Sequence, residues 1–334
     1  MKSLSTAPLA LVLYSLCFVP NPLSVTSPSA GSQDHAAPST ASVWSSTKAE
    51  HVDGFPDIKP NKKGTLTLSA DSLTFSGKSG RTSIERSSIT AVSAGNQRVE
   101  LWGTGGRLMR MGIPDGGGLA AATFMHHRVD MLTVAFRDAR GGDHSAVFFL
   151  PAKEADVALH SFAVSNVASR EASAAVCQAG LIEPKSVLVS VPDWKGAEVP
   201  AAYQSLVYEH VIERLRRTKD VGDVYRDGEV NGETACPQYV IHTSIVSFKQ
   251  GSSVQRAFLG PIGMFVGTTQ MRFDVKFTEA SGKVDASEPI SATIRGDSES
   301  TGVADLVAKK IAKHYAALLK NAGKSNSAKE RGAE

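Results

Sequence analysis

Residues 64–77 (GTLTLSADSLTFSG) and 146–162 (AVFFLPAKEADVALHSF) decide the fold that this sequence predicts. In the first stretch, two runs of alternating apolar and polar residues flank a Ser-Ala-Asp turn, which is the pattern of a β-hairpin. In the second stretch, an apolar strand stops at Pro151, and apolar residues then recur at spacings of three and four, as on one face of a helix. The sequence therefore predicts a group of short strands that a single helix closes.

Further strands are predicted between these two stretches, because short alternating runs there are separated by glycine-rich turns. The runs are 82–84, 89–92, 99–102, 107–111, 131–136 and 145–150. An insert at 112–128 is longer than a hairpin needs. The expected domain thus has seven or so strands followed by one helix.

This order resembles the pleckstrin-homology superfold, and in particular the GRAM-like and bacterial PH-like domains. The motifs that carry the resemblance are GTLTLSADSLTF and, after a turn, RTSIERSSITAVSAG. The matching positions are Gly64, Leu66, Leu68, Leu73, Phe75, Ile84, Ile89 and Val92. The resemblance covers about residues 64–167 and implies a β-sandwich or barrel with a C-terminal helix, a fold typical of binding modules.

A second domain is predicted over residues 185–321. Its strands are expected at 187–191, 239–248, 269–278 and 290–294, with one helix after Pro200 and another from Thr301 to Leu319. The order β-α-β-β-β-α predicts a sheet-and-helix sandwich, so the fold class is α+β with two domains. This order is similar to that of small domains in bacterial envelope lipoproteins, and the whole chain resembles an exported bacterial protein.

The N-terminal residues 1–30 are predicted to be a signal peptide. Lys2 precedes an apolar run at 7–19 that is too short for an ordinary transmembrane helix. An uncleaved anchor is the alternative, whereas Leu16 before Cys17 does not fit a lipoprotein signal. We expect an exported protein, periplasmic or extracellular, that is soluble or peripheral on a membrane. Residues 31–63 are predicted to be a disordered linker, 168–184 a connector and 322–334 a disordered tail.

The charge balance argues against a nucleic-acid partner. The chain has 36 lysines and arginines against 33 acidic residues, a formal net charge of +3, and no clustered basic footprint. Beyond the signal peptide, Cys177 and Cys236 are the remaining cysteines. In an oxidising compartment they are candidates for one disulfide, and two separate buried thiols are the alternative.

No catalytic residue, metal site or cofactor site is predicted. The densest set of possible metal ligands is His126 and His127 beside Asp130, with His144 from the next strand. Adjacent side chains on an extended segment point apart, so this set is a weak candidate and no cofactor is expected. The chain contains no G-x-S-x-G nucleophile motif.

Three surfaces are predicted to make contacts. The apolar glycine-rich run 254–268 and the insert 112–128 are candidates for contact with a partner or a membrane, and buried turns are the alternative. Their contact residues would be Phe258, Leu259, Ile262, Met264 and Phe265, with Phe124 and Met125. Arg214, Arg216 and Arg217 form a candidate anion contact, for which a solvated helix end is the alternative.

These observations predict a non-enzymatic envelope protein that binds or assembles with a protein partner or a membrane surface. One alternative is a hydrolase or metal-dependent enzyme with its site at the domain interface. Another is a carrier of a small hydrophobic ligand. A concave pocket with convergent titratable groups would favour the enzyme, and an enclosed apolar cavity would favour the carrier.

Overall fold

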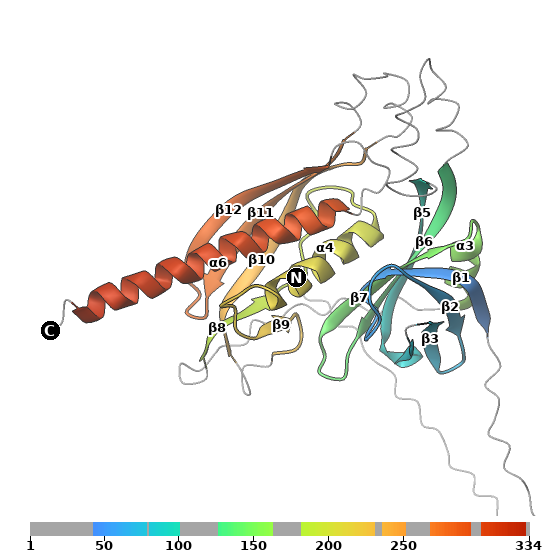
Figure 1. Cartoon of the computed structure of the whole chain (residues 1–334), viewed down its shortest axis with the longest axis horizontal. Coiled ribbons are helices and arrows are strands. Elements are labelled where there is room, and N and C mark those ends of the chain that lie inside the picture. The colour runs from blue at the N-terminus through green and yellow to red at the C-terminus, as the bar shows by residue number, and fades with distance from the viewer. Residues whose placement is uncertain are drawn as a thin grey trace, which may run out of the picture. The chain divides into compact units, whose positions relative to one another are not determined.

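A computed structural model describes residues 43–78, 80–100, 126–162, 182–230, 236–251, 268–294 and 302–331. These residues form a mixed α+β structure with one seven-stranded and one five-stranded sheet (Figure 1), which confirms the predicted α+β class. The strands of the seven-stranded sheet precede those of the five-stranded sheet in the chain.

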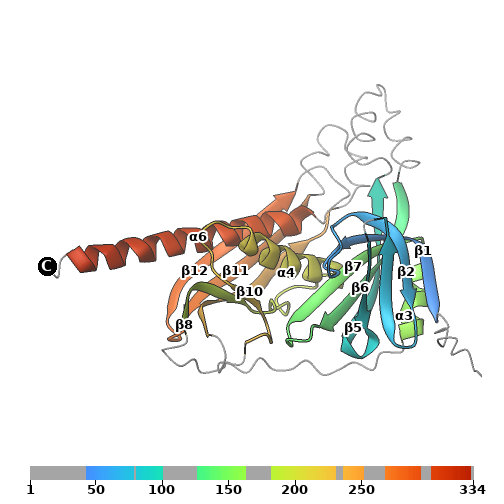
Figure 2. The same ribbon diagram turned by 60° about the horizontal axis from the view of Figure 1, so that its bottom comes forward.

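The first sheet is antiparallel throughout, in the order β4-β3-β2-β1-β7-β6-β5. Its strands are β1 (Trp44–Asp53), β2 (Lys62–Leu68), β3 (Ser72–Gly77), β4 (Gly80–Glu85), β5 (Ile89–Glu100), β6 (His126–Arg137) and β7 (Asp143–Leu150). The short helix η1 (Arg86–Ser88) precedes β5, and α3 (Glu154–Phe162) follows β7. Pairing of β1 with β7 joins two runs of sequential hairpins, and α3 packs against β5, β6 and β1 (Figure 2).

The prediction of a linker at 31–63 is wrong from Trp44 onward, because β1 lies in the middle of the first sheet. Its apolar residues do not alternate regularly, since the register shifts between Ser46 and Ala49. In addition, two of its buried residues, Ser46 and His51, are polar. A strand with a bulge and buried polar residues has no clean two-residue hydrophobic period, and that period is the signal from which strands are predicted.

The interior of the first sheet is filled with aromatic side chains. The rings of Phe55, Phe75 and Phe148 lie 5.5–6.5 Å apart and are at most 3% exposed. Arg86 fixes the end of α3, because its guanidinium donates to the carbonyl oxygens of Ser161 and Phe162 at 3.0 and 2.7 Å. A cation at a helix C-terminus satisfies carbonyl groups that have no partner within the helix.

The second sheet has the order β12-β11-β10-β8-β9. Its elements are β8 (Ile182–Val189), α4 (Ala201–Arg216), β9 (Val224–Arg226), β10 (Cys236–Lys249), β11 (Thr269–Glu279), β12 (Val284–Ile294) and α6 (Gly302–Arg331). β8 is parallel to β9 and β10, and the other pairs are antiparallel. The short strand β9 was not predicted, and α6 continues to Arg331, so residues 322–331 are helical and not a disordered tail.

Helices α4 and α6 contact each other, and α6 also packs on β11 and β12 (Figure 1). Strand β11 buries one face in strict alternation. In β11, Met271, Phe273, Val275 and Phe277 are at most 1% exposed, as the sequence predicts, while the residues between them are exposed.

Helix α4 is buried on more than one face. It also packs on β6 and β7 of the first sheet, and Val52, Met131 and Val147 of that sheet belong to the same hydrophobic core as α4. A helix that is apolar on most sides must be covered on most sides. Consistent with this sharing, all described residues fall in one compact unit, Thr40–Glu334.

Candidate functional site

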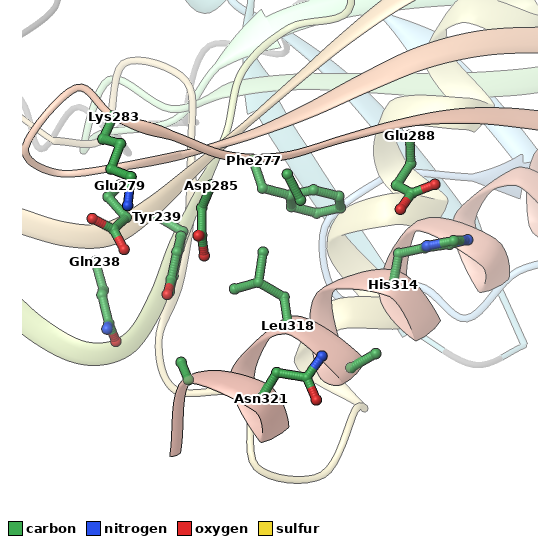
Figure 3. A pocket seen from close by; sticks show the side chains of 13 residues that line it. Gln238, Tyr239, Phe277, Glu279, Lys283, Asp285, Glu288, His314, Leu318 and Asn321 are labelled. Atoms are coloured by element: carbon green, nitrogen blue, oxygen red, sulfur yellow. The ribbon is translucent and has the colours of Figure 1, made fainter. Parts of the chain in front are cut away.

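A groove of about 570 Å³ lies between the β11–β12 hairpin, the first half of β10 and helix α6 (Figure 3). Its volume is typical of a site for a small ligand. Its polar lining residues are Gln238, Tyr239, Glu279, Lys283, Asp285, Glu288, His314 and Asn321. Its apolar lining residues are Phe277, Ala286, Ala317, Leu318 and Ala322.

A bulge in β12 gives the groove its acidic rim. Phe277 pairs with Ala286 but Thr278 pairs with Val284, so Asp285 is an extra residue without a partner on β11. In a regular strand, neighbouring residues point to opposite faces, whereas a bulge turns one of them. Both Asp285 and Ala286 therefore line the groove, and Glu288 joins them two residues further on.

The inner wall of the groove is aromatic. The Tyr239 ring lies edge-on to Tyr315, with centroids 5.8 Å apart, and Phe277 stacks on Tyr315 at 6.1 Å. The Tyr315 hydroxyl donates within 3.1 Å of the carbonyl oxygens of Lys185 and Ser186. By contrast, Tyr239 is 1% exposed, and its hydroxyl makes no hydrogen bond to any described residue.

Burial raises the pKa of Tyr239, and the carboxylates of Asp285 and Glu279 raise it further. The phenol therefore stays protonated near neutral pH, with its O–H available to donate and its lone pairs available to accept. Figure 3 shows the Tyr239 hydroxyl and the Asp285 carboxylate directed toward the same opening.

The rim carboxylates are not neutralised locally. Among the described residues, no cation lies within 4.0 Å of Glu279, Asp285 or Glu288 in an ion pair. Nor does any hydrogen bond between lining residues join a nucleophile to a base, as covalent catalysis requires. The groove can hold a positively charged ligand by charge and hydrogen bonding.

The other cluster of charged groups is a closed junction between the two sheets. Arg226 of β9 and Glu209 of α4 form a bidentate ion pair of 2.9 and 2.6 Å, and both side chains are 6% exposed. Arg226 also donates to the carbonyl oxygen of Asp143 at 3.1 Å, and Glu209 accepts the backbone N–H of Ser145 at 2.9 Å. We call Glu209, Arg226, Asp143 and Ser145 the sheet junction.

Within the sheet junction, the Glu209 carboxylate stabilises the charged form of Arg226. Burial alone would lower the pKa of Arg226, but the adjacent Glu209 carboxylate outweighs it, and the pKa is raised. Arg226 therefore stays charged, and both of its terminal nitrogens donate to protein oxygens, whereas its Nε is buried without a hydrogen-bond partner among the described residues. Such a bidentate pair fixes the orientation of two elements relative to each other.

A second contact between α4 and the first sheet joins His210 to Asp53 at 2.8 Å. Burial works to raise the pKa of Asp53, but hydrogen bonds from His210 and from the Gly54 backbone outweigh it and lower the pKa. The carboxylate is therefore ionised at neutral pH and fixes α4 against β1.

The three arginines predicted to contact an anion each have a partner in the structure. Arg214 pairs with Asp305 of α6 at 2.6 Å, and Arg217 pairs with Glu213 one helical turn away. Arg216 donates to the Val224 carbonyl oxygen at 3.3 Å. They do not form one free cationic cluster, and the anion contact stays a prediction.

The weak metal candidates do not converge. His144 pairs in register with Phe136, which is ten residues along β6 from His126 and nine from His127. At the rise of a β-strand this separation is about 30 Å, so the expectation that His144 could approach them was wrong. His144 instead contacts Asp138 at 3.2 Å and stacks on Phe136. No group of three metal-ligating side chains occurs in the described residues.

The predicted apolar contact residues lie outside the described residues. These are Phe124, Met125, Phe258, Leu259, Ile262, Met264 and Phe265. Cys177 is also outside them, and Cys236 is fully buried at the start of β10, so the disulfide stays a prediction.

Sequence reasoning selected none of the residues that line the groove. The available signal was the spacing of Glu279, Asp285 and Glu288 around the turn that joins two strands. That signal is weak, because regular alternation would place Asp285 and Glu288 on opposite faces, and only the bulge brings them together.

The fold and the groove define a class of α+β protein in which a meander sheet and a mixed sheet share one helix. No protein-family model and no curated protein matches this chain. Within the described ranges, no helix combines the length and the apolar character that a bilayer crossing needs.

Among solved structures, a PelC dodecamer from Paraburkholderia phytofirmans is similar to this chain. The match covers 38% of this chain and 84% of that chain, with 17% identity and a TM-score of 0.27. A Xanthomonas campestris protein of the DUF330 family matches over 48% of this chain and 94% of that chain, with 10% identity and a TM-score of 0.25. Likenesses this low carry no argument about function or assembly.

Proposed function

We propose that this protein is an exported component of a bacterial cell envelope and that it acts by binding a partner, not by catalysis. The observation that carries the proposal is the contrast between the sheet junction and the groove. The buried ion pair of Glu209 and Arg226 is closed by protein partners, whereas the groove carries unpaired carboxylates on an open surface. A scaffold that fixes its internal charges and exposes a charged groove is suited to recognition.

The order of the first sheet supports a PH-like or GRAM-like module within this scaffold. Antiparallel strands are followed directly by helix α3, as the resemblance implies, and strand β1 joins them from outside the range 64–167 that the resemblance covers. The aromatic interior of this sheet is filled by Phe55, Phe75 and Phe148, which favours binding at the surface over carriage of a hydrophobic ligand inside it. The order of strands and helices in the second sheet supports the proposal that it belongs to an envelope-type domain.

Export and partner binding can be tested together. The full chain with a C-terminal tag would be expressed in a Gram-negative host, fractionated, and cross-linked in intact cells. We expect the protein in the periplasmic or extracellular fraction, with a cross-linked partner in the envelope. Recovery only in the cytoplasm, or an envelope fraction without any cross-linked species, would overturn the proposal.

The surface that binds the partner can be identified with matched variants. One variant carries Glu279→Gln, Asp285→Asn and Glu288→Gln in the groove. The control carries Asp71→Asn, Glu85→Gln and Asp274→Asn, which remove the same charge from exposed positions elsewhere. Loss of the partner in the groove variant alone assigns the contact to the groove. Addition of anionic liposomes to the purified protein tests a membrane surface as the alternative partner.

A hydrolase is the second candidate, because the groove brings carboxylates and an imidazole together. Figure 3 shows the Glu288 carboxylate facing the His314 ring. The test is to measure turnover of ester, glycoside and phosphoester substrates. Turnover by the wild type that is lost in Glu288→Gln would show that the protein is an enzyme and not only a binding protein.

A further inference from the structure

We propose that the groove between the β11–β12 hairpin and α6 binds alkylammonium groups, supplied by a linear oligoamine or by lysine side chains. This inference rests on the proposed binding function and names the chemical class of the ligand. Three features of the groove argue for it: its charge, an unpartnered buried hydroxyl, and the distribution of its carboxylates.

The charge of the groove selects a cation. Its lining has three carboxylates, Glu279, Asp285 and Glu288, and one lysine, Lys283, which gives a formal charge of −2 with His314 neutral. Among the described residues none of these carboxylates is held in an ion pair. An anionic ligand would be repelled, and a cation would find carboxylates whose described hydrogen bond from a side chain is limited to that of the Ser281 hydroxyl to Glu279, at 3.3 Å.

The second feature is the Tyr239 hydroxyl. The residue is 1% exposed, its hydroxyl has no hydrogen bond to any described residue, and it lines the groove. A nearly buried polar group without a partner is costly unless a ligand or solvent satisfies it. Its neighbour Tyr315 has two carbonyl acceptors, so the lack of a partner is specific to the tyrosine that faces the groove.

The carboxylates are spread along the groove and do not converge on one point. No set of three potential metal ligands occurs among the described residues, which argues against a single bound metal ion. Separated acceptors suit a ligand with more than one charged group on a connecting chain. An ammonium group has three donors in a compact head, which matches carboxylates and a phenol oxygen.

The apolar part of the lining suits the hydrocarbon chain that connects the ammonium groups of the ligand. Phe277 and Leu318 face the space between the carboxylates (Figure 3). Methylene groups of the ligand bury apolar area against Leu318, which is partly exposed, whereas Phe277 is already covered by the protein. A hydroxylated ligand without charge would lose the electrostatic part of this recognition.

The test is isothermal titration calorimetry of the full chain with two amine ligands. The first is spermidine, and the second is a capped tetralysine peptide. The neutral comparisons are 1,8-octanediol and the same peptide with all lysines acetylated. We expect binding of at least one amine ligand, weakening as salt is added, and no binding of the neutral compounds.

Two triple variants are compared. One neutralises the three carboxylates of the groove, and the control neutralises three exposed carboxylates elsewhere. The triple change Glu279→Gln, Asp285→Asn and Glu288→Gln should weaken binding by about tenfold or more, and the control triple change should leave it unaltered. Tyr239→Phe removes one hydroxyl without changing charge and should weaken binding about threefold to tenfold. Circular dichroism confirms that each variant is folded.

Binding of spermidine supports a free oligoamine as the source of the ammonium groups. Binding of the peptide alone supports lysine side chains of a protein partner. Absence of binding for both amines at millimolar concentration overturns the inference, as do equal affinities in the groove and control variants. Either result would leave the cross-linking experiment as a separate test of partner binding, so the two proposals can fail independently.

Discussion

At the scale of the residue, His51 is the polar side chain most completely enclosed in the first sheet. It is 0% exposed, and its Nε2 accepts the Phe55 backbone N–H at 2.9 Å. Its Nδ1 lies 3.3 Å from the Lys59 carbonyl oxygen, so the neutral ring has its proton on Nδ1. Burial lowers the pKa of His51, because the charged imidazolium would lose its hydration in this enclosed position.

This geometry predicts a loss of stability on mild acidification. Because the folded-state pKa of His51 lies below the ordinary value of 6.5, the unfolded chain takes up the proton first as pH falls. His144 and His242, whose pKa values burial also lowers, act in the same direction. Urea unfolding at pH 7.5 and pH 5.5 should give a lower midpoint at the acidic pH.

The variant His51→Gln should be less stable than the wild type but should show a smaller difference between the two pH values. The exposed His160→Gln change on α3 serves as the control and should keep the wild-type difference. An unchanged pH difference in His51→Gln would exclude His51 as a source of the effect.

The sheet junction makes a second prediction at this scale. Arg226→Met leaves the Glu209 carboxylate buried without its counter-charge, which should cost about 3–5 kcal/mol of unfolding free energy. Arg217→Met removes a solvent-exposed ion pair and should cost less than about 1 kcal/mol. Adding Glu209→Leu to Arg226→Met should restore part of the loss. Similar losses in both single variants by urea denaturation would contradict a buried junction.

At the scale of the element, two turns show how close backbone packing constrains the chain. Gly228, after β9, has φ +86°, and a Cβ there would lie 2.4 Å from the Gly141 carbonyl oxygen in the β6–β7 turn. Gly282, in the β11–β12 turn, has a similar φ of +82° but open space around it. At Gly282 a side chain would add only the strain of a left-handed backbone. At Gly228 it would add the same strain and also a steric clash.

Alanine substitutions at these positions should differ in effect. Gly282→Ala should cost about 1–2 kcal/mol, which is the price of the left-handed conformation for a residue with a Cβ. Gly228→Ala should cost a further 1–3 kcal/mol or so, because the backbone at Gly141 must move away. Urea unfolding of both variants measures the difference, and equal losses would indicate that the backbone at Gly228 does not closely approach Gly141.

Elements with a regular hydrophobic period were predictable from the sequence. The apolar spacing after Pro200 predicted α4, and the alternation at 269–278 predicted β11. β1 was not predictable in this way, because its bulge and its buried Ser46 and His51 break the period. The groove was missed for a related reason, since the bulge at Asp285 places adjacent residues on one side of the strand.

At the scale of the whole molecule, the sharing of α4 means that the two sheets are not independent. Val52, Met131 and Val147 of the first sheet lie in the core that α4 builds with the second sheet. The sequence could not indicate this contact, because a helix with a wide apolar face does not reveal which element covers each part of it.

We therefore expect a single cooperative unfolding transition. Trp44 lies in the core of the first sheet, and Trp194 lies 5.7 Å from Phe273 of the second. Two variants, each with Trp102 replaced and with either Trp44 or Trp194 as its single tryptophan, would report on the sheets separately by fluorescence. Their urea midpoints should coincide after correction for the stability of each variant, and two separate midpoints would show that the sheets unfold independently.

The position of α4 in the chain has a consequence for biogenesis. The strands of the first sheet and α3 precede α4 in the chain, so they leave the ribosome before α4 does. Until then, the outer surface formed by Val52, Met131 and Val147 faces water as an apolar patch. A nascent chain with such a patch is prone to premature association until α4, which ends at Arg216, has emerged and covers it.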